Sequence, residues 1–267
     1  MVIPTLNEAD NLTHVLPRLP DFLSEVIIVD GESTDGTVEV ARRLRPDVRV
    51  VRQIGRGKGT ALRQGFAAAR GDIIVSMDAD GSTAPEEIAG FVDALMAGAH
   101  YVKGSRFMRG GSSEDLTLLR SSGNVGLTLL VRLLHGAHFT DLCYGYNAFW
   151  SRVLPSLHLR STGFEIETEM NLRAHHAGLR VVEIPSREMD RIHGESHLQT
   201  FPDGWRVLKT ILRERVRRVP ATGVAPVPVP IHRPAMVAIA IQPDPVPELL
   251  PDGGFAVEED YPLAGAR

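Results

Sequence analysis

The run Ile73-Ile74-Val75-Ser76-Met77-Asp78-Ala79-Asp80-Gly81 joins a short apolar segment to two carboxylates and a glycine. The apolar part is typical of a buried β-strand, and Asp78 and Asp80 follow directly at its carboxyl end. In open α/β sheets, ligands bind at that end of the strands. Two carboxylates there can share one divalent cation, and oxygen ligands suit Mg²⁺ or Mn²⁺. The alternative interpretation is a solvated, Asp-rich turn.

Similar apolar runs alternate with helical patterns along the first half of the chain. The expected strands are 26–29, 48–51, 73–77 and 101–104, and the expected helices are 37–44, 59–69 and 85–96. The second half is less regular, with expected helices at 116–134, 165–177 and 203–217 and expected strands at 144–150 and 181–184. Strands that alternate with helices predict an α/β fold with a mostly parallel central sheet flanked by helices.

The character of the sequence changes at Pro220. Ten of the 18 prolines lie in residues 220–267, together with six acidic and two basic residues. Proline neither continues a helix nor donates a hydrogen bond within a sheet, so we expect a mostly disordered C-terminal tail. The tail carries a net charge of −4, as does the whole chain, so residues 1–219, the expected catalytic domain, are neutral in sum. A nucleic-acid binder would show a basic excess, and this chain does not.

Composition bounds the class of protein further. The 267 residues are 43% hydrophobic, which suffices for a sizeable core, and the single cysteine, Cys143, suits a reducing cytoplasm. The sequence has neither a secretion-signal pattern nor a run of roughly 18 apolar residues, so we expect a cytoplasmic protein with no transmembrane segment. Residues 205–218 combine six basic residues with apolar residues at helical spacing. This pattern fits an ordinary core-facing helix, and it also fits an interfacial helix at the inner face of the cell membrane.

Two further segments carry candidate ligand-binding groups. Asp30 ends the strand 26–29, where its carboxylate can accept hydrogen bonds from a base or a ribose; the alternative is a turn or a helix cap. Gly55-Arg56-Gly57-Lys58-Gly59 is a flexible cationic loop before a helix, which suits a diphosphate or a base edge. The spacing of a P-loop is absent from this segment.

Taken in order, these motifs resemble the family 2 glycosyltransferases, which have the GT-A nucleotide-diphospho-sugar transferase fold. The resemblance is to the dolichol- or polyprenyl-phosphate sugar transferase branch and covers about residues 1–215. The matching segments are 2–8, 29–37, 57–59, 78–81, 104–107, 120–124, 141–147, 163–169 and 191–196.

The resemblance implies a nucleotide-sugar site and a cation. Asp78 and Asp80 would hold the sugar-nucleotide diphosphate through Mg²⁺ or Mn²⁺, which neutralises charge on the leaving group. The residues implied to border the base and ribose are Pro4, Asn7, Glu8, Asp30 and Lys58.

The resemblance also implies an acceptor site. Arg106 and Arg120 match positions that would bind an acceptor phosphate. Asp141 is the expected catalytic base, with alternatives at Glu167 and Glu169. A lipid phosphate is already an anion, so proton abstraction would matter little for such an acceptor.

The last implied part is a mobile loop that closes over donor and acceptor. Arg191 and Ser196 belong to this loop, and His197 stands where the family usually has Lys. Asn147 likewise stands where many relatives have Arg. The pair His175-His176 has no partner at zinc-like spacing, so we expect exposed polar side chains and not a metal site.

The expected activity is inverting, metal-dependent transfer of a hexose from GDP-mannose or UDP-glucose to a polyprenyl or dolichyl phosphate. A soluble metabolite or glycan is the alternative acceptor. Two other classes stay open: a sugar-1-phosphate nucleotidyltransferase and a non-catalytic nucleotide-sugar binding module. The first needs a glycine-rich loop after the first strand, where this chain has Thr5-Leu6-Asn7-Glu8.

Overall fold

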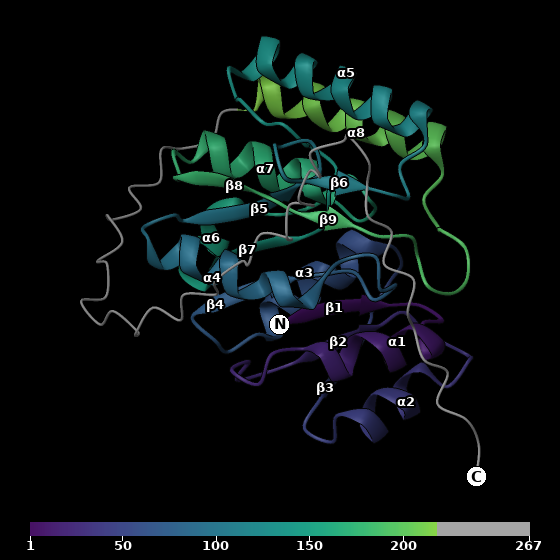
Figure 1. The fold of residues 1–267 in the computed structure, drawn as a ribbon. Helices are drawn as coiled ribbons and strands as arrows, with labels where there is room; N and C mark the ends of the chain where they lie inside the picture. The colour runs from purple at the N-terminus through teal and green to yellow at the C-terminus, as the bar shows by residue number, and fades with distance from the viewer. Residues whose placement is uncertain (218–267) are drawn as a thin grey trace, which may run out of the picture. The chain divides into compact units, whose positions relative to one another are not determined.

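The computed structural model describes residues 1–217, whose centre is a seven-stranded sheet (Figure 1). The strand order is β3-β2-β1-β4-β7-β5-β8. The bounds are β1 Val2–Thr5, β2 Ile27–Asp30, β3 Arg49–Arg52, β4 Ile73–Ser76, β5 Tyr101–Ser105, β7 Asn147–Trp150 and β8 Val181–Pro185. Only β7 runs antiparallel to its neighbours, β4 and β5. A small second sheet pairs β6 Ser112–Ser113 with β9 Arg187–Glu188.

Eight α-helices lie in the described part of the chain, with three short 3₁₀ turns between elements. The helices are α1 Ala9–Val15, α2 Thr37–Leu44, α3 Lys58–Ala68, α4 Ile88–Met96, α5 Leu118–His135, α6 Leu154–Leu157, α7 Ile166–His176 and α8 Thr200–Val216. Within residues 1–217, no helix has the length and apolar character needed to cross a membrane.

The predicted α/β fold with a mostly parallel sheet is confirmed, and the differences have local causes. The strand predicted at 144–150 is shorter and antiparallel. Helix α8 begins at Thr200, three residues earlier than predicted, because Pro202 stands in the first turn, where its missing N–H needs no partner. Helix α1 was not predicted; it has only seven residues, too few for a clear periodicity. The tail predicted over 220–267 lies outside the described residues.

The core is built on strands buried on both faces. All four residues of β2 are buried, as its continuous apolar run predicts. Helix α3 lies very close to this sheet at Gly65, where an added Cβ would come within 2.3 Å of Val2 Cγ1. Glycine is therefore needed at this crossing for steric reasons.

A second apolar cluster holds α5, α7 and α8 together. It includes Val131 on α5, Leu172 on α7 and Val207 and Ile211 on α8. Figure 1 shows α5 and α8 running alongside each other. A buried ion pair between Arg173 Nη2 on α7 and Glu214 Oε1 on α8, 2.9 Å long, ties the same helices. These helices therefore form one wall over the second half of the sheet.

Candidate active site

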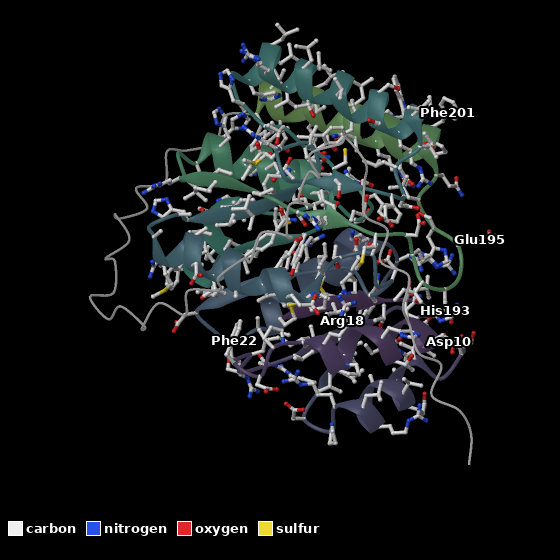
Figure 2. The ribbon with its side chains drawn as sticks, viewed as in Figure 1. Asp10, Arg18, Phe22, His193, Glu195 and Phe201 are labelled. Atoms are coloured by element: carbon white, nitrogen blue, oxygen red, sulfur yellow. The ribbon has the colours of Figure 1, made fainter. Side chains whose placement is uncertain are left out.

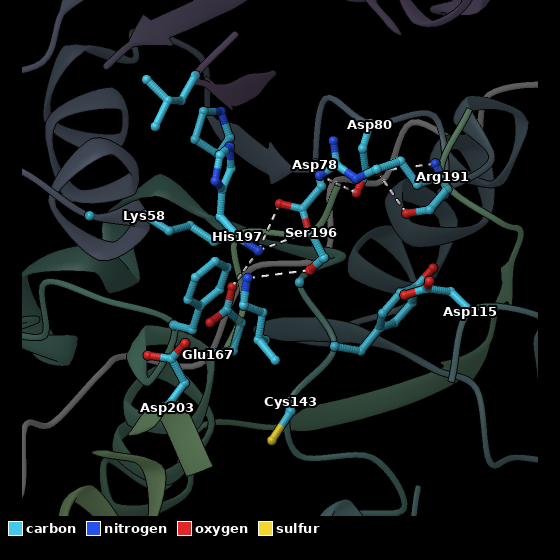
Figure 3. Close-up of a pocket in the computed structure, with 18 of the residues that line it drawn as sticks. Lys58, Asp78, Asp80, Asp115, Cys143, Glu167, Arg191, Ser196, His197 and Asp203 are labelled. Carbon is cyan, nitrogen blue, oxygen red and sulfur yellow. Dashed lines mark hydrogen bonds and ion pairs between the residues drawn. The ribbon is translucent and has the colours of Figure 1, made fainter. Parts of the chain in front are cut away.

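One cavity of about 710 Å³ opens at the carboxyl ends of the parallel strands and contains most of the predicted site (Figure 3). Loops after β1, β4 and β5 contribute to it, together with α3, α5, α7, α8 and the segment before α8. The predicted residues that line it are Pro4, Glu8, Lys58, Asp78, Asp80, Arg106, Arg120, Glu167, Arg191 and Ser196. These residues therefore lie around one cavity at the strand ends, where open α/β sheets bind ligands.

Asn7 and Asp30 do not line this cavity but organise the loop beside it. Asn7 has a left-handed backbone with φ 57°, and its Oδ1 accepts a hydrogen bond from the Thr34 N–H at 2.9 Å. Asp30 Oδ2 accepts the N–H groups of Glu32 and Ser33, each at 3.1 Å. Both side chains therefore fix the β2–α2 loop.

Lys58 joins two carboxylates at the centre of the cavity. Its Nζ lies 2.7 Å from Asp78 Oδ1 and 2.9 Å from Glu167 Oε1. Burial alone would lower the pKa of Lys58, but the two carboxylates outweigh it and raise that pKa, so the ammonium stays charged. Burial raises the pKa of Glu167, against the lowering effect of Lys58. The three groups behave as one coupled unit.

Arg191 makes a second bridge. Its Nη2 lies 3.2 Å from Asp80 Oδ2, and its Nη1 lies 3.1 Å from Glu8 Oε1. Burial raises the pKa of Glu8. The other oxygen of Asp80 accepts from Ser82 Oγ at 2.7 Å. Arg191 thus ties the segment before α8 to the loops after β1 and β4.

Asn11 attaches the same segment to α1 and was missed from the sequence. Its Oδ1 accepts the His193 N–H at 2.9 Å, while its Nδ2 donates to the His193 carbonyl at 3.1 Å. The two residues are 182 positions apart, so no local pattern signals this pairing.

The carboxylates of Asp78 and Asp80 fit a divalent cation. Both are oxygen donors on one cavity wall, and Mg²⁺ is commonly held by one or two carboxylates with substrate phosphates and water completing its shell. In residues 1–217, no group of three or more His, Cys, Asp or Glu has the arrangement of a metal site. Two carboxylates would leave the other positions of such an ion open to oxygen atoms of a ligand or of water.

Asp141 lies behind the cavity wall. Its side chain is fully buried and pairs with Arg106, with Nε 2.7 Å from Oδ2 and Nη2 3.0 Å from Oδ1. Asn124 Nδ2 donates to the same carboxylate at 3.2 Å. Burial alone would raise the pKa of Asp141, but the bonds and charge of Arg106 hold it below its usual range. A base must reach the reacting atoms, and this carboxylate does not line the cavity.

Arg106 lines the cavity, and neighbouring side chains hold its guanidinium in place. Its Nη1 also pairs with Glu188 Oε2 at 3.0 Å, and its guanidinium lies over the Tyr144 ring at 4.7 Å from the centroid. These contacts fix the plane of the guanidinium, and the residue still lines the cavity.

Arg120 lies in the first turn of α5. Its Nη2 donates to the Leu198 carbonyl at 3.3 Å and its Nε to Thr200 Oγ1 at 3.4 Å. Arg120 thus links α5 to the start of α8.

The alternative base Glu169 is buried away from the cavity, where its Oε2 accepts the N–H groups of Arg160 and Ser161.

The prediction of exposed side chains at His175 and His176 is wrong. Both are half-buried, and His176 Nε2 lies 2.9 Å from His135 Nδ1. His175 Nε2 lies 3.1 Å from the His135 carbonyl, and His135 Nε2 lies 3.1 Å from the Ile211 carbonyl. The histidines thus form a polar joint between α5, α7 and α8.

Comparison with known proteins identifies the family. Residues 1–154 match the profile described as glycosyl transferase family 2. The chain belongs to this family. Undecaprenyl-phosphate mannosyltransferase of Micrococcus luteus is 34% identical over 209 residues, which are 74% of this chain and 86% of that protein. Polyprenol monophosphomannose synthase of Mycolicibacterium smegmatis is 34% identical over 211 residues, or 74% of this chain and 80% of that one.

A solved structure supports the fold of this family 2 glycosyltransferase. It is glucosyl-3-phosphoglycerate synthase from Mycobacterium tuberculosis in complex with Mn²⁺, UDP and glucosyl-3-phosphoglycerate. The similarity has a TM-score of 0.63 at 25% identity and covers 80% of this chain and 78% of that one. The predicted GT-A architecture is therefore confirmed.

Proposed function

We propose that this glycosyltransferase moves a hexosyl group from a nucleotide diphosphate sugar to a polyprenyl phosphate, with inversion at the anomeric carbon. One observation carries the proposal: Arg106 and Arg120 line the same cavity as Asp78 and Asp80. A cavity with a carboxylate pair for a cation and a guanidinium pair for a phosphate suits a diphosphate donor and a phosphate acceptor together. The names of the two bacterial relatives given above support this acceptor class.

The donor would lie over the first half of the sheet. Pro4, Glu8 and Lys58 line the cavity there, while Asn7 and Asp30 support the loop beside it. Asp78 and Asp80 would hold a divalent cation, which is supported by the presence of Mn²⁺ in the complex of the solved relative. Such an ion, when bound, neutralises charge on the leaving diphosphate. Lys58 beside Asp78 and Arg191 beside Asp80 add fixed positive charge, which would attract the diphosphate of the donor. The donor would be GDP-mannose or UDP-glucose.

The acceptor phosphate would lie against Arg106 and Arg120. Its oxygen attacks the anomeric carbon, a new C–O bond forms, and the bond to the diphosphate oxygen breaks with its electron pair. A phosphate oxygen is already ionised at neutral pH, so the transfer needs no general base. Asp141 then acts as a positioning residue that orients Arg106, and Ser196 and Arg191 close the cavity from the segment before α8.

A soluble phosphorylated acceptor is the second candidate. The solved relative holds glucosyl-3-phosphoglycerate, in which the glucosyl group is attached to a small phosphorylated acid. Arg106 and Arg120 would bind a phosphate of that kind equally well. The two candidates differ in the apolar part of the acceptor.

Docking to a membrane surface completes the proposal. Helix α5 exposes Leu118, Leu129 and Leu133 and contains no acidic residue, and α8 exposes Phe201 and Trp205. The basic residues of α8 are Arg206, Lys209, Arg213 and Arg215. Apolar side chains beside basic ones favour an anionic lipid surface. The buried stripe of α8, Val207 and Ile211, belongs to the second apolar cluster, as the core-facing alternative predicts.

The test is a transfer assay with purified protein and Mn²⁺ or Mg²⁺. Radiolabelled GDP-mannose and UDP-glucose are combined separately with undecaprenyl phosphate in detergent and with 3-phosphoglycerate. We expect a lipid-extractable product with the opposite anomeric configuration to the donor. Transfer to 3-phosphoglycerate alone would establish the second candidate and overturn the first.

A further inference from the structure

The cavity continues past Arg120 into a passage between α5 and α8. On α5 its walls are Leu119, Gly123 and Leu127, which are spaced by four residues and therefore share one face. On α8 they are Gly204 and Val207, three residues apart. Each helix thus turns glycine and aliphatic residues toward the passage, with one polar neighbour on each helix, Asn124 on α5 and Asp203 on α8.

The two glycines leave the passage open. A Cβ added at Gly123 or at Gly204 would meet no atom within 4 Å outside its own helix, so a longer side chain would extend into free space. Neither residue has the positive φ that requires glycine. Glycine inside a helix is less favourable than alanine, so helix formation does not account for it here.

The passage changes from cationic to apolar along its length. Arg106 and Arg120 line the cavity, and Arg120 contacts Leu198 and Thr200 where α8 begins. Leu127 and Val207, further along the two helices, also belong to the second apolar cluster. Outside it, Phe201 lies exposed at the start of α8, near the α5–α8 pair (Figure 2). A ligand complementary to this profile has an anionic head and a hydrocarbon chain.

We propose that the hydrocarbon chain of the acceptor runs between α5 and α8 across Gly123 and Gly204, and that this glycine pair determines which acceptors enter. The proposal rests on the proposed function, because it assumes a lipid phosphate as acceptor. It adds the path of the chain and two specificity-determining residues. Neither glycine contacts the reacting atoms, so their effect is on acceptor binding.

The experiment uses Gly123→Leu and Gly204→Leu, with Gly126→Leu as matched control. Gly126 also lies on α5, and its Cβ position also meets no atom within 4 Å, but it does not line the cavity. The acceptors are undecaprenyl phosphate and citronellyl phosphate, which has a short chain. We expect Gly123→Leu and Gly204→Leu each to raise KM for undecaprenyl phosphate by about tenfold or more, because the leucine side chain would occupy space that the hydrocarbon chain needs. KM for citronellyl phosphate should change less, and Gly126→Leu should resemble wild type with both.

Two controls keep the outcomes separate. Thermal unfolding of all three variants should match or exceed wild type, since leucine favours a helix more than glycine, and nucleotide binding should be unchanged. If KM rose equally for both acceptors, or rose equally in Gly126→Leu, the proposed path of the chain would be wrong and the proposed function would be unaffected. If the wild-type protein transfers the sugar to 3-phosphoglycerate and not to a polyprenyl phosphate, the proposed function is wrong. The proposed path of the hydrocarbon chain is then wrong as well. Gly123→Ala should give an intermediate KM.

Discussion

Arg106 and Asp141 form a buried bidentate ion pair, with Nε 2.7 Å from Oδ2 and Nη2 3.0 Å from Oδ1. The carboxylate is fully buried, while the guanidinium reaches the cavity wall. The buried carboxylate therefore fixes the orientation of a guanidinium that lines the cavity. Bidentate geometry restrains both the position and the plane of Arg106.

Asp141→Asn should weaken both folding and acceptor binding. Removing one charge from a buried pair costs about 3 kcal/mol, because the remaining charge loses its partner. Urea denaturation should show this loss, moderated by the second partner of Arg106, Glu188 at 3.0 Å. KM for the acceptor should rise while nucleotide binding stays near wild type.

The control for Asp141→Asn is the exposed pair Arg18–Glu86, with 2.9 Å between Nη2 and Oε2. Glu86→Gln should cost less than about 1 kcal/mol, as is usual for surface pairs. A fall in kcat with unchanged acceptor KM, and loss of the acid limb of the pH–rate profile, would instead make Asp141 the catalytic base.

Lys58→Met should leave Glu167 as an unpaired buried carboxylate. That side chain is 2% exposed, so we expect a loss of about 3 kcal/mol near pH 8. Burial raises the pKa of Glu167, so the folded variant binds more protons than the unfolded chain from about pH 4.3 up to that raised pKa. The unfolding free energy should therefore increase as the pH falls through this window, as measured by urea denaturation.

The double variant Lys58→Met/Glu167→Gln separates charge from packing. With the buried charge removed, stability should recover in part and its dependence on pH should weaken. Nucleotide binding should not recover, because the proposed function assigns to Lys58 the positive charge beside the donor. Equal destabilisation in the single and double variants would contradict the coupling of the two residues.

The sequence predicts which site residues lie at strand ends better than it predicts the contacts between residues far apart in the chain. Asp78 and Asp80 follow a strand whose apolar run is unambiguous, and parallel strands bring their carboxyl ends to one edge. The cavity position of this pair therefore follows from local patterns. Asn11 and His193 pair across 182 residues, which a local pattern does not contain.

The role expected for Asp141 illustrates the same limit. Its motif position predicts a catalytic base beside the acceptor, whereas the structure pairs its carboxylate with Arg106 behind the cavity wall. Whether a carboxylate faces a cavity or an arginine behind its wall depends on side-chain packing of β5, α5 and the loop before β7. The prediction that His175 and His176 are exposed is wrong for the same reason, because their partner His135 comes from α5.

Asp80→Asn should weaken metal-dependent donor binding. The amide retains the shape of the side chain, and its oxygen can still accept from Ser82. Its NH2 group cannot accept from Arg191, and it lacks the charge that attracts a divalent cation. Titration with Mn²⁺ and the nucleoside diphosphate should show binding weakened by about a hundredfold, near 3 kcal/mol. Asp115→Asn, on the acceptor side of the same cavity, should bind the nucleotide as wild type does. Equal binding by Asp80→Asn and wild type, with EDTA having no effect, would remove the cation from the proposal.

The histidine joint should make stability depend on pH. Burial lowers the pKa of His135 and of His176, while an unfolded histidine titrates near pH 6.5. Between the lowered pKa and pH 6.5 the unfolded chain binds more protons, so stability is present above this window and is lost as the pH falls through it. Thermal unfolding should thus occur at lower temperature at pH 5.5 than at pH 7.5. His176→Gln should reduce this difference, and the exposed His138→Gln should not.

Vesicle binding should follow the exposed side chains of α5 and α8. Trp205 is 56% exposed whereas the other tryptophan, Trp150, is 7% exposed, so a blue shift in emission on adding vesicles reports mainly on Trp205. We expect this shift with anionic vesicles and a weaker one with neutral vesicles or high salt, because basic residues flank the apolar ones. Leu129→Ser/Leu133→Ser should reduce binding with little effect on folding, since both side chains are exposed. Ile54→Ser, which removes an apolar side chain before α3 that is more exposed than either leucine, is the control. If it reduced binding as much, α5 would not be the membrane-facing element.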